Sequence, residues 1–290
     1  MHKIGIIGYG ICGLAVETGL QTISDIYIYD KYKSSDSLAT VISESNIWFI
    51  CLPTPMSDDG SCDTSIVDSV CTKIGYLAKD KKGPKLLVIK STVPPGTTDR
   101  IAKETGLSVV FNPEFLTEKN FIQDFLEQDR IIYGASSQAI FSDVVLIVKL
   151  YSDFAKTQAK PAIVFETSSS TVAEMTKYMT NCFLATKLSF FNEMYEICQA
   201  TGLEYDEVVE MFLLDGRIGK SHYKVPGSDG QRGFSLSCLP KDLNAMIAFA
   251  EGVGVDPMML QTAWTKNLLV RDNHDWENLA QVTGGYKDED

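Results

Sequence analysis

The first half of the chain alternates short apolar runs with longer stretches of mixed polarity. Each apolar run has the length of a buried strand, and three of the intervening stretches have the pattern of a helix. Alternation of this kind predicts a mostly parallel sheet with helices on both faces. The predicted strands are residues 3–7, 25–30, 46–50, 86–89, 109–111, 130–133 and 161–165, and the predicted helices are residues 14–23, 65–78 and 137–151.

The pattern changes after the last predicted strand. A long helical pattern begins near residue 168, where Thr171 and Glu174 form a predicted capping box, and it reaches about residue 200. Residues 182–191 are apolar around most of this helix, which predicts burial in a core or in a dimer interface. Further helices are predicted at residues 205–214, 242–252 and 256–270, and the polar, acidic end at residues 281–290 is expected to be frayed.

A glycine-rich turn follows the first predicted strand at once. The stretch Gly8-Tyr-Gly-Ile-Cys-Gly13 lies between that strand and a helix, and Asp30 ends the next strand. The first glycine allows a tight turn, the second lets a pyrophosphate approach the backbone, and the third lets the helix pack on the strand. An acid at position 30 accepts hydrogen bonds from the adenine ribose and favours NAD over NADP. The alternative is an ordinary turn between a strand and a helix.

These patterns predict an α/β fold with two domains. Residues 1–166 would form a Rossmann-like, doubly wound, mostly parallel sheet that binds NAD. Residues 167–290 would form an all-helical central domain for substrate binding and dimerisation, and this domain would carry the cysteine loop described below.

Four polar residues follow the carboxyl ends of predicted strands. Thr54, Thr92, Glu114 and Glu118 each lie just past such an end. Ligands of doubly wound sheets lie beyond the carboxyl ends of the strands, so these residues are candidate ligand contacts. Turn chemistry and helix capping also account for threonine and glutamate at these places, and this alternative stays open.

One cysteine lies in a loop-like segment late in the chain, Arg232-Gly-Phe-Ser-Leu-Ser-Cys-Leu-Pro-Lys-Asp242. Pro240 disfavours helix at the preceding residue, so Cys238 is predicted to precede a helix that begins near Lys241. A helix N-terminus and a nearby cation both favour the thiolate, which is the nucleophilic form. The alternative is an inert, buried cysteine, because cysteine is among the most buried residue types.

Basic and amide side chains accompany this cysteine in the second half of the chain. Lys177 and Asn181 are four residues apart on the long predicted helix, so they share a face. Lysines also cover apolar helix surface without forming a site. The loop at residues 215–232 is rich in glycine and in basic residues, which would suit an anionic ligand of an acidic protein.

Composition narrows the class of protein. The chain has 38 acidic and 26 basic residues, with a net charge of −12, which argues against nucleic acid or an anionic membrane as a partner. No apolar run approaches the length of a membrane span, and the N-terminus has the pattern of a strand rather than of a signal peptide. Seven cysteines without a Cys-x-x-Cys pair fit a reducing cytosol, with no disulfide framework and no metal site. The protein is therefore predicted to be cytoplasmic.

In combination, the motifs resemble those of the UDP-glucose/GDP-mannose dehydrogenase family, from about Lys3 to Val270. They are Gly8-x-Gly-x-x-Gly13, Pro53-Thr-Pro55, Ser91-Thr-Val-Pro-Pro-Gly96, Asn112-Pro-Glu-Phe-Leu116 with Glu118, Lys177-x-x-x-Asn181, Arg217-Ile-Gly219 and Cys238-Leu-Pro-Lys-Asp242. The family oxidises nucleotide sugars to uronic acids. The resemblance implies a four-electron oxidation with release of two NADH, and the likeness around residues 217–223 favours UDP-glucose as the substrate.

The resemblance also implies roles for the matching residues. Cys238 would hold the aldehyde as a thiohemiacetal and then as a thioester, while Lys177 and Asn181 stabilise the oxyanion. Asp242 and Glu118 would transfer protons and activate a water that Thr92 helps to position. The implied cofactor contacts are Gly8, Tyr9, Gly10, Ile11, Gly13, Asp30, Pro53, Thr54, Thr92, Glu118 and Lys241. The implied substrate contacts are Glu114, Phe115, Leu116, Lys177, Asn181, Arg217, Tyr223, Phe234 and Cys238, with Arg217 supplied by the second subunit of a homodimer.

The sequence departs from the family pattern in two places. Ser235 and Leu236 stand where the family has glycines before the nucleophile, and a leucine there could narrow the sugar pocket or weaken turnover. The chain also ends near where longer members begin a further nucleotide-binding-type domain. It is therefore expected to be a short form, in which residues 226–232 would partly cover the nucleotide end of the substrate.

Two other functions stay open on the sequence alone. A β-hydroxyacid dehydrogenase shares the fold plan and a lysine and an asparagine on the central helix, but it performs one oxidation and needs no thiol. A nucleotide-sugar or NAD-binding protein with impaired turnover would account for Ser235 and Leu236.

Overall fold

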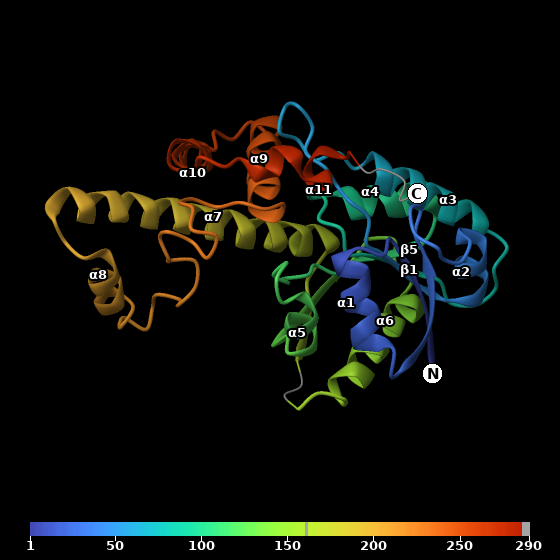
Figure 1. Ribbon diagram of the computed structural model, residues 1–290. Helices are drawn as coiled ribbons and strands as arrows, with labels where there is room; N and C mark the ends of the chain where they lie inside the picture. The colour runs from blue at the N-terminus through green and yellow to red at the C-terminus, as the bar shows by residue number, and fades with distance from the viewer. Residues whose placement is uncertain (160–161, 286–290) are drawn as a thin grey trace. The chain divides into compact units, whose positions relative to one another are not determined.

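The computed structural model describes residues 1–159 and 162–285. Contacts divide the chain into two units, residues 1–54 with 63–177 and residues 55–62 with 178–285, and helix α7 (Ser170–Thr201) runs through the division (Figure 1). The boundary predicted after residue 166 stays a prediction. Pro161 of the last predicted strand and residues 286–290 of the predicted frayed end lie outside the described residues. No described helix is both long enough and apolar enough to cross a membrane.

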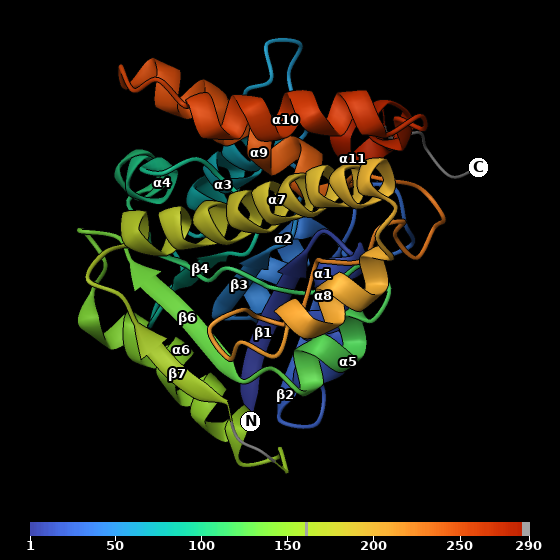
Figure 2. The same ribbon diagram turned by 90° about the vertical axis from the view of Figure 1, so that its left-hand side faces the viewer.

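The first unit is built on a seven-stranded sheet in the order β2-β1-β3-β4-β5-β6-β7, with β6 and β7 at one edge (Figure 2). All neighbouring strands are parallel except β5 and β6, which are antiparallel. The predicted doubly wound, mostly parallel sheet is therefore confirmed. The strands are β1 (His2–Ile7), β2 (Ser24–Tyr29), β3 (Ile47–Ile50), β4 (Leu86–Ile89), β5 (Ser108–Phe111), β6 (Arg130–Ala135) and β7 (Ile163–Glu166).

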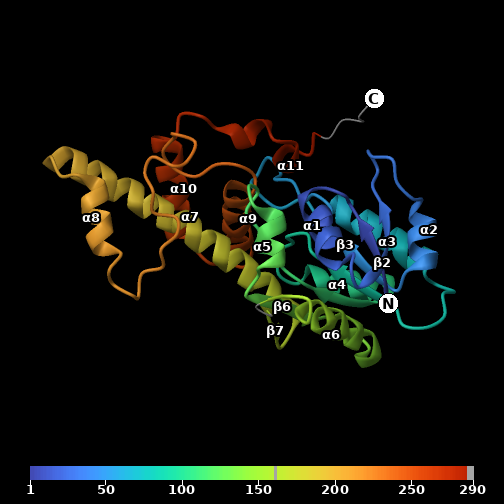
Figure 3. The same ribbon diagram turned by 60° about the horizontal axis from the view of Figure 1, so that its bottom comes forward.

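Successive side chains of each strand point to opposite faces of the sheet, so the strands contribute to two separate cores. In β3, Ile47 and Phe49 pack on one face of the sheet, while Trp48 and Ile50 pack on the other. The first core is closed by α1 (Ile11–Leu20), α5 (Phe121–Leu126) and α6 (Phe141–Ala155), and the second by α2 (Leu38–Glu44), α3 (Ser65–Leu77) and α4 (Thr97–Thr105). Figure 3 shows α1 and α2 on opposite sides of the strands. The continuous apolar runs in the sequence follow from burial on both faces.

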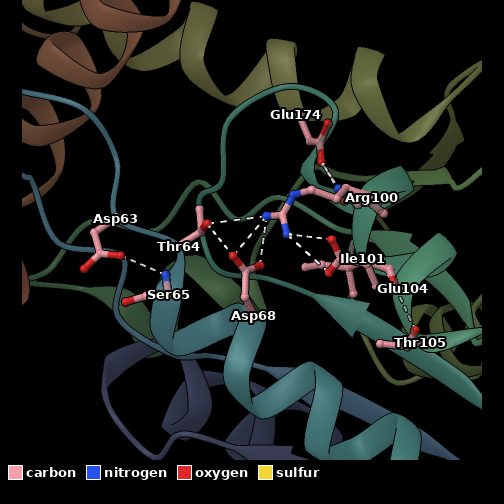
Figure 4. Close-up of polar contacts among 10 residues, drawn as sticks. Asp63, Thr64, Ser65, Asp68, Arg100, Ile101, Glu104, Thr105 and Glu174 are labelled. Carbon is pink, nitrogen blue, oxygen red and sulfur yellow. Dashed lines mark hydrogen bonds and ion pairs between the residues drawn. The ribbon is translucent and has the colours of Figure 1, made fainter.

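Polar contacts fasten α3 and α4 to each other within the first unit (Figure 4). Arg100 of α4 donates to Asp68 of α3 at 2.9 Å and to the Thr64 hydroxyl at 3.4 Å. Its other guanidinium nitrogen donates to Glu104 at 3.4 Å. These contacts hold the helix that directly follows the polar turn after β4, so they help to fix that turn.

The predicted capping box at Thr171 and Glu174 is wrong. Helix α7 already begins at Ser170, and the Glu174 carboxylate accepts hydrogen bonds from the Gly96 amide at 2.6 Å and the Thr98 amide at 2.8 Å. Glu174 therefore satisfies amides at the N-terminus of α4 rather than that of its own helix. Burial raises the pKa of Glu174, against the lowering effect of these hydrogen bonds.

The second unit is helical, apart from a short bridge between Met56 and Cys62. Ser189 on α7 donates to the Ala263 carbonyl on α10 at 2.8 Å, which ties these helices together. Two cores form here, one between α7, α9 and α10 and the other between α7, α8 and the loop that follows α8. Besides α7, the helices are α8 (Tyr205–Phe212), α9 (Cys238–Gly252), α10 (Met258–Val270), the 3₁₀ helix η1 (Asp275–Asn278) and α11 (Ala280–Thr283).

Two further expectations for this unit need correction. Helix α9 begins at Cys238 and not near Lys241, because a proline in the first turn lacks only an amide that has no helical partner there. Residues 182–191 are predicted to be buried around most of the helix, but only one side of α7 is buried there. Cys182 and Phe191 are buried, whereas Phe183 and Phe190 are exposed on this chain. The predicted dimer interface stays a prediction.

Candidate functional site

The glycine turn after β1 is shaped by close backbone contacts. Gly8 has φ +94°, and a Cβ atom on it would lie 2.5 Å from the Cys51 carbonyl oxygen. A Cβ on Gly13 would lie 2.2 Å from the Gly8 carbonyl oxygen, whereas a Cβ on Gly10 would meet nothing within 4 Å. The first and third glycines are therefore required by packing. The second leaves open space at the start of α1, where a phosphate could approach the backbone.

Asp30 is tied directly to this turn. It follows β2, and its carboxylate accepts hydrogen bonds from the Tyr9 amide at 2.7 Å and the Tyr32 amide at 2.8 Å. The Gly8 amide donates to the Tyr29 carbonyl at 2.8 Å, which closes the same corner. The acid is thus held beside the glycine turn in a fixed orientation, and each oxygen keeps lone-pair capacity for a ribose hydroxyl.

The side chains flanking the turn leave the α1 N-terminus open. Tyr9 donates its hydroxyl to Glu17, and this hydrogen bond with burial raises the pKa of Tyr9 to about 12. Ile11, the first residue of α1, is exposed, and no side chain caps this helix. An uncapped N-terminus, open space at Gly10 and an oriented acid fit the pyrophosphate and ribose of NAD, so the residues present suit this cofactor.

The turns after β3 and β4 meet each other. The Thr54 hydroxyl donates to the Thr92 carbonyl at 2.8 Å, and the Ser91 hydroxyl donates to the Leu52 carbonyl at 2.7 Å. Pro53 lies between these contacts in the chain. The predicted cofactor residues Pro53, Thr54 and Thr92 are therefore brought together at one edge of the sheet.

The segment after β5 carries the predicted sugar-binding residues of the first unit. The Lys177 ammonium lies 5.4 Å from the centre of the Phe115 ring, a cation–π distance. Leu116 packs against the sheet core, and Glu118 is half-buried. The Glu114 atom Oε2 is buried and has no hydrogen-bond partner among the described residues. An unsatisfied buried acceptor fits a carboxylate that meets a ligand hydroxyl.

A buried polar cluster surrounds the start of α9 in the second unit. Asp242, whose side chain is 1% exposed, accepts from the Asn181 amide at 2.6 Å and from the Lys241 ammonium at 2.5 Å. Burial acts to lower the pKa of Lys241, but Asp242 and the nearby sulfurs of Cys62 and Cys238 act to raise it, and the net pKa is raised. Lys241 therefore stays a cation close to the first residue of the helix.

Cys238 lies at the N-terminus of α9, in the second unit. It is half-buried and is the first residue of a 15-residue helix, so the positive end of the helix dipole acts on its sulfur. Asp242 lies one turn further along the same helix. Lys177 precedes Asn181 by one turn of α7, which places both on one face of that helix. The predicted approach of Cys238 to Lys177 and to the dinucleotide crevice stays a prediction.

The turn before Cys238 is held by residues that the sequence did not single out. Asn267 of α10 is fully buried; its side-chain oxygen accepts from the Phe234 amide at 2.6 Å, and its side-chain nitrogen donates to the Phe234 carbonyl at 3.1 Å. Leu236 has φ +64°, and its amide donates to Asp275 at 3.3 Å. The family glycine is thus replaced by a leucine that keeps a left-handed backbone.

A buried arginine supports the segment that leads into this turn. The Arg271 guanidinium donates to Asp229 at 2.6 Å and to the Arg232 carbonyl at 3.1 Å. Burial acts to raise the pKa of Asp229, but Arg271 and the Gln231 amide lower it on balance. Asn267 occupies a buried position of α10, whose core face is otherwise apolar, and the buried Arg271 directly follows that helix. A polar residue at an otherwise apolar core position is the only signal in the sequence that could have indicated them.

The loop after α8 carries two of the predicted substrate residues. Arg217 is exposed and forms an ion pair with Asp215. The Tyr223 carbonyl accepts from the Tyr205 hydroxyl at 2.6 Å, and the Lys187 ammonium donates to the Gly219 carbonyl at 2.5 Å. Phe234, by contrast, is buried against α9 and α10. The predicted contacts of Arg217, Tyr223 and Phe234 with a substrate stay predictions.

Family models match both parts of the chain. Residues 2–155 match the NAD binding domain of the UDP-glucose/GDP-mannose dehydrogenase family, and residues 171–268 match its central domain. The chain belongs to the UDP-glucose/GDP-mannose dehydrogenase family. The family resemblance and the NAD-binding domain predicted from the sequence are therefore confirmed.

Individual relatives and a solved structure that match the chain have names that fit this family. The chain is 33% identical over 258 residues to the UDP-glucose 6-dehydrogenase AglM of Haloferax volcanii, covering 85% of this chain and 57% of the relative. It is 31% identical over 278 residues to a GDP-mannose 6-dehydrogenase of Pseudomonas syringae pv. tomato, covering 91% and 60%. A UDP-glucose dehydrogenase structure from Pyrobaculum islandicum matches with a TM-score of 0.80 and 27% identity, covering 93% and 68%.

The chain thus spans less than two thirds of the length of these two curated relatives. Their names include two different nucleotide sugars, so family membership leaves the sugar open. The part of the chain that the structure describes contains no group of three or more His, Cys, Asp or Glu residues placed to bind a metal ion.

Proposed function

We propose that this protein oxidises the C6 alcohol of a nucleotide sugar, UDP-glucose by preference, to the carboxylate in two NAD-dependent steps. The observation that carries the proposal is the cluster at the start of α9. There Cys238 begins the helix, Lys241 remains a cation, and the buried Asp242 is bound to Asn181. A single-step alcohol dehydrogenase needs no such thiol.

Each residue has a part in a balanced sequence of steps. The alcohol carbon first loses a hydride, and its hydroxyl proton passes to a carboxylate, which leaves an aldehyde. The Cys238 sulfur then adds to the aldehyde carbon, and Lys177 and Asn181 stabilise the oxyanion that forms. Loss of a second hydride gives a thioester. Water adds to the thioester and expels the Cys238 thiolate, which Asp242 and Glu118 would assist by proton transfer.

Two NAD+ molecules, bound one after the other, would each accept one hydride. The open N-terminus of α1 and Asp30 support NAD binding in the first unit. Thr92 would help to position the nicotinamide and the water. Residues 114–116 would line the sugar pocket, and Arg217 would bind the phosphates of the substrate.

The stoichiometry of NADH tests this proposal. We expect two NADH for each UDP-glucose consumed, with a smaller or no yield from GDP-mannose. Cys238→Ser should lose the second oxidation, whereas Cys198→Ser, which changes a buried cysteine of the second unit, should keep the full yield. One NADH per sugar would favour a single-step dehydrogenase. Binding of UDP-glucose without any NADH would favour a protein with impaired turnover.

We also infer that the protein forms a homodimer through α7. Four of the large apolar side chains that α7 exposes are spaced by four or seven residues, so they lie along one face of the helix. They are Met179, Phe183, Phe190 and Ile197. An exposed apolar stripe of this kind favours association. Light scattering should give the mass of a dimer, and Phe183→Glu should give a monomer, while the exposed Thr265→Glu on α10 should remain a dimer.

A further inference from the structure

Two cysteines from distant parts of the first unit touch each other. Cys12 is the second residue of α1, inside the glycine turn, and Cys51 directly follows β3. Their sulfur atoms are 3.5 Å apart although 39 residues separate them in the chain. Both thiols are free and half-buried. Neither has a part in the reaction proposed above.

The pair lies at the point where the strand order of the sheet reverses. Strand β1 is flanked by β2 on one side and by β3 on the other, so the chain runs from β1 to β2 on one side and then crosses to β3 on the opposite side. Dinucleotides bind in the crevice outside the carboxyl ends of the strands at such a point. Cys12 lies in the turn after β1 and Cys51 follows β3, so both thiols lie beyond the carboxyl ends of the two strands that flank this point.

Charged groups from neighbouring strand ends face the pair. Lys90 directly follows β4, is buried, and donates to the Asn112 side-chain oxygen at 3.1 Å. The hydrogen bond with Cys51, burial and the Glu114 carboxylate raise the pKa of Cys12, and the Lys90 ammonium only partly opposes them. Cys12 is thus held as a thiol at neutral pH. A thiol of raised pKa reacts slowly, because the thiolate is the form that attacks.

We propose that Cys12 and Cys51 form a reversible disulfide that closes the dinucleotide crevice to NAD. The oxidant is a low-molecular-weight disulfide, such as oxidised glutathione. One cysteine sulfur attacks the reagent, forms a mixed disulfide and releases one thiol. The second cysteine then attacks the mixed disulfide, forms the Cys12–Cys51 bond and releases the second thiol. Two electrons and two protons pass from the protein to the two thiols that leave.

Disulfide formation would tie the start of α1 to the end of β3. A disulfide is about 2.0 Å long, so the two sulfurs must approach by roughly 1.5 Å. Gly8 already lies against the Cys51 carbonyl, and Gly13 lies against the Gly8 carbonyl. The first turn of α1 would take up this approach, and its amides are the groups that would bind the pyrophosphate. The disulfide should consequently weaken NAD binding.

The test uses the full chain carrying Cys238→Ser, so that oxidation of the proposed nucleophile plays no part. After treatment with oxidised glutathione, peptide mass mapping should show the Cys12 and Cys51 peptides joined with the loss of two hydrogens. Calorimetry should show NAD affinity reduced at least tenfold, and dithiothreitol should restore it. The matched control adds Cys51→Ser and should keep its NAD affinity under the same oxidant.

NAD should also oppose the oxidation. If the disulfide lowers NAD affinity by some factor, saturating NAD must disfavour the disulfide by the same factor. Mapping that finds Cys12 and Cys51 still reduced overturns the proposal, as does a disulfide that leaves NAD affinity unchanged. These readouts need no turnover, so they stay separate from a failure of the proposed sugar oxidation. Absence of NAD binding by the reduced protein would overturn the inhibitory role as well.

Discussion

Two turns of this protein lead into helices that matter for function, and they are built differently. The turn at residues 8–13 precedes α1, and the turn at residues 233–238 precedes α9. In the first, a carbonyl oxygen lies only 2.5 Å from where the Cβ of Gly8 would be, and another lies 2.2 Å from where the Cβ of Gly13 would be. In the second, Leu236 has φ +64° and a side chain that is 46% exposed. A positive φ alone does not demand glycine; a neighbouring backbone atom at the Cβ position does.

The two turns also differ in what holds them. The first is fixed mainly by its own backbone and by that of the adjoining strand ends, with one side chain, Asp30, bound to an amide of the turn. The second is held by side chains of other helices, with Asn267 bound to both polar backbone groups of Phe234 and Asp275 bound to the Leu236 amide. A turn held by side chains can tolerate changes in its own sequence. Loss of those supporting side chains should harm it most.

The largest effect is therefore expected at Asn267. Asn267→Leu keeps the size of the side chain but leaves the amide and carbonyl of Phe234 buried without partners. Each such group costs about 1–3 kcal/mol, so the free energy of unfolding should fall by about 3 kcal/mol. Urea denaturation measures this loss. Turnover should fall with it because Cys238 ends the turn, while NAD affinity of the first unit should stay within about twofold.

A control on the same helix separates this effect from a general weakening of α10. Thr265 is exposed and its hydroxyl bonds only within the helix, so Thr265→Ala should change the unfolding free energy by less than about 0.5 kcal/mol. If Asn267→Leu is equally mild, the second turn does not depend on the side chains of its neighbours. The contrast with the first turn would then be lost.

A smaller effect is expected at Gly13. The Cβ of Gly13→Ala would lie 2.2 Å from the Gly8 carbonyl oxygen, so the turn must shift. Overpacking of this kind costs about 2 kcal/mol, within the usual range for such changes. NAD affinity, measured by calorimetry, should fall at least tenfold because the amides of α1 move with the turn.

Gly10→Ala tests whether the pyrophosphate binds at the first turn. Its Cβ meets nothing within 4 Å, so the unfolding free energy should stay within about 0.5 kcal/mol of the original. Its NAD affinity should still fall, because a methyl group would occupy the space through which the pyrophosphate approaches. Unchanged NAD binding in this variant would contradict the assignment of the pyrophosphate to this turn.

The same contrast explains what the sequence could predict. The sheet and the glycine turn were predictable because they depend on local patterns, apolar runs and a strand–turn–helix motif. Asn267 and Arg271 were not, since their partners lie more than thirty residues away in the chain. The start of α9 was misplaced because Pro240 disfavours helix before it in general but is tolerated within a first turn. The contact between Cys12 and Cys51 likewise depends on which strands become neighbours.

The smallest effects are expected at Leu236. A left-handed conformation costs a residue with a Cβ about 1–2 kcal/mol, and glycine avoids this cost but loses about 0.5–1 kcal/mol through the greater freedom of its unfolded chain. Leu236→Gly should therefore raise the unfolding free energy by less than about 1 kcal/mol. Leu236→Val should lower it by about 1 kcal/mol, because a branched Cβ fits this conformation worst. Urea midpoints should follow the order glycine, leucine, valine.

Leu236→Ala then decides how the leucine affects catalysis. Alanine keeps the cost of the left-handed backbone but removes most of the side chain, so its stability should match that of the original protein. If the leucine narrows the sugar pocket, Leu236→Ala and Leu236→Gly should both lower KM for the sugar. If the backbone is what matters, only the glycine variant should change turnover. Because Leu236 is half-exposed and its amide is held by Asp275, we expect the second result. Equal gains from alanine and glycine would place the constraint in the side chain and not in the turn.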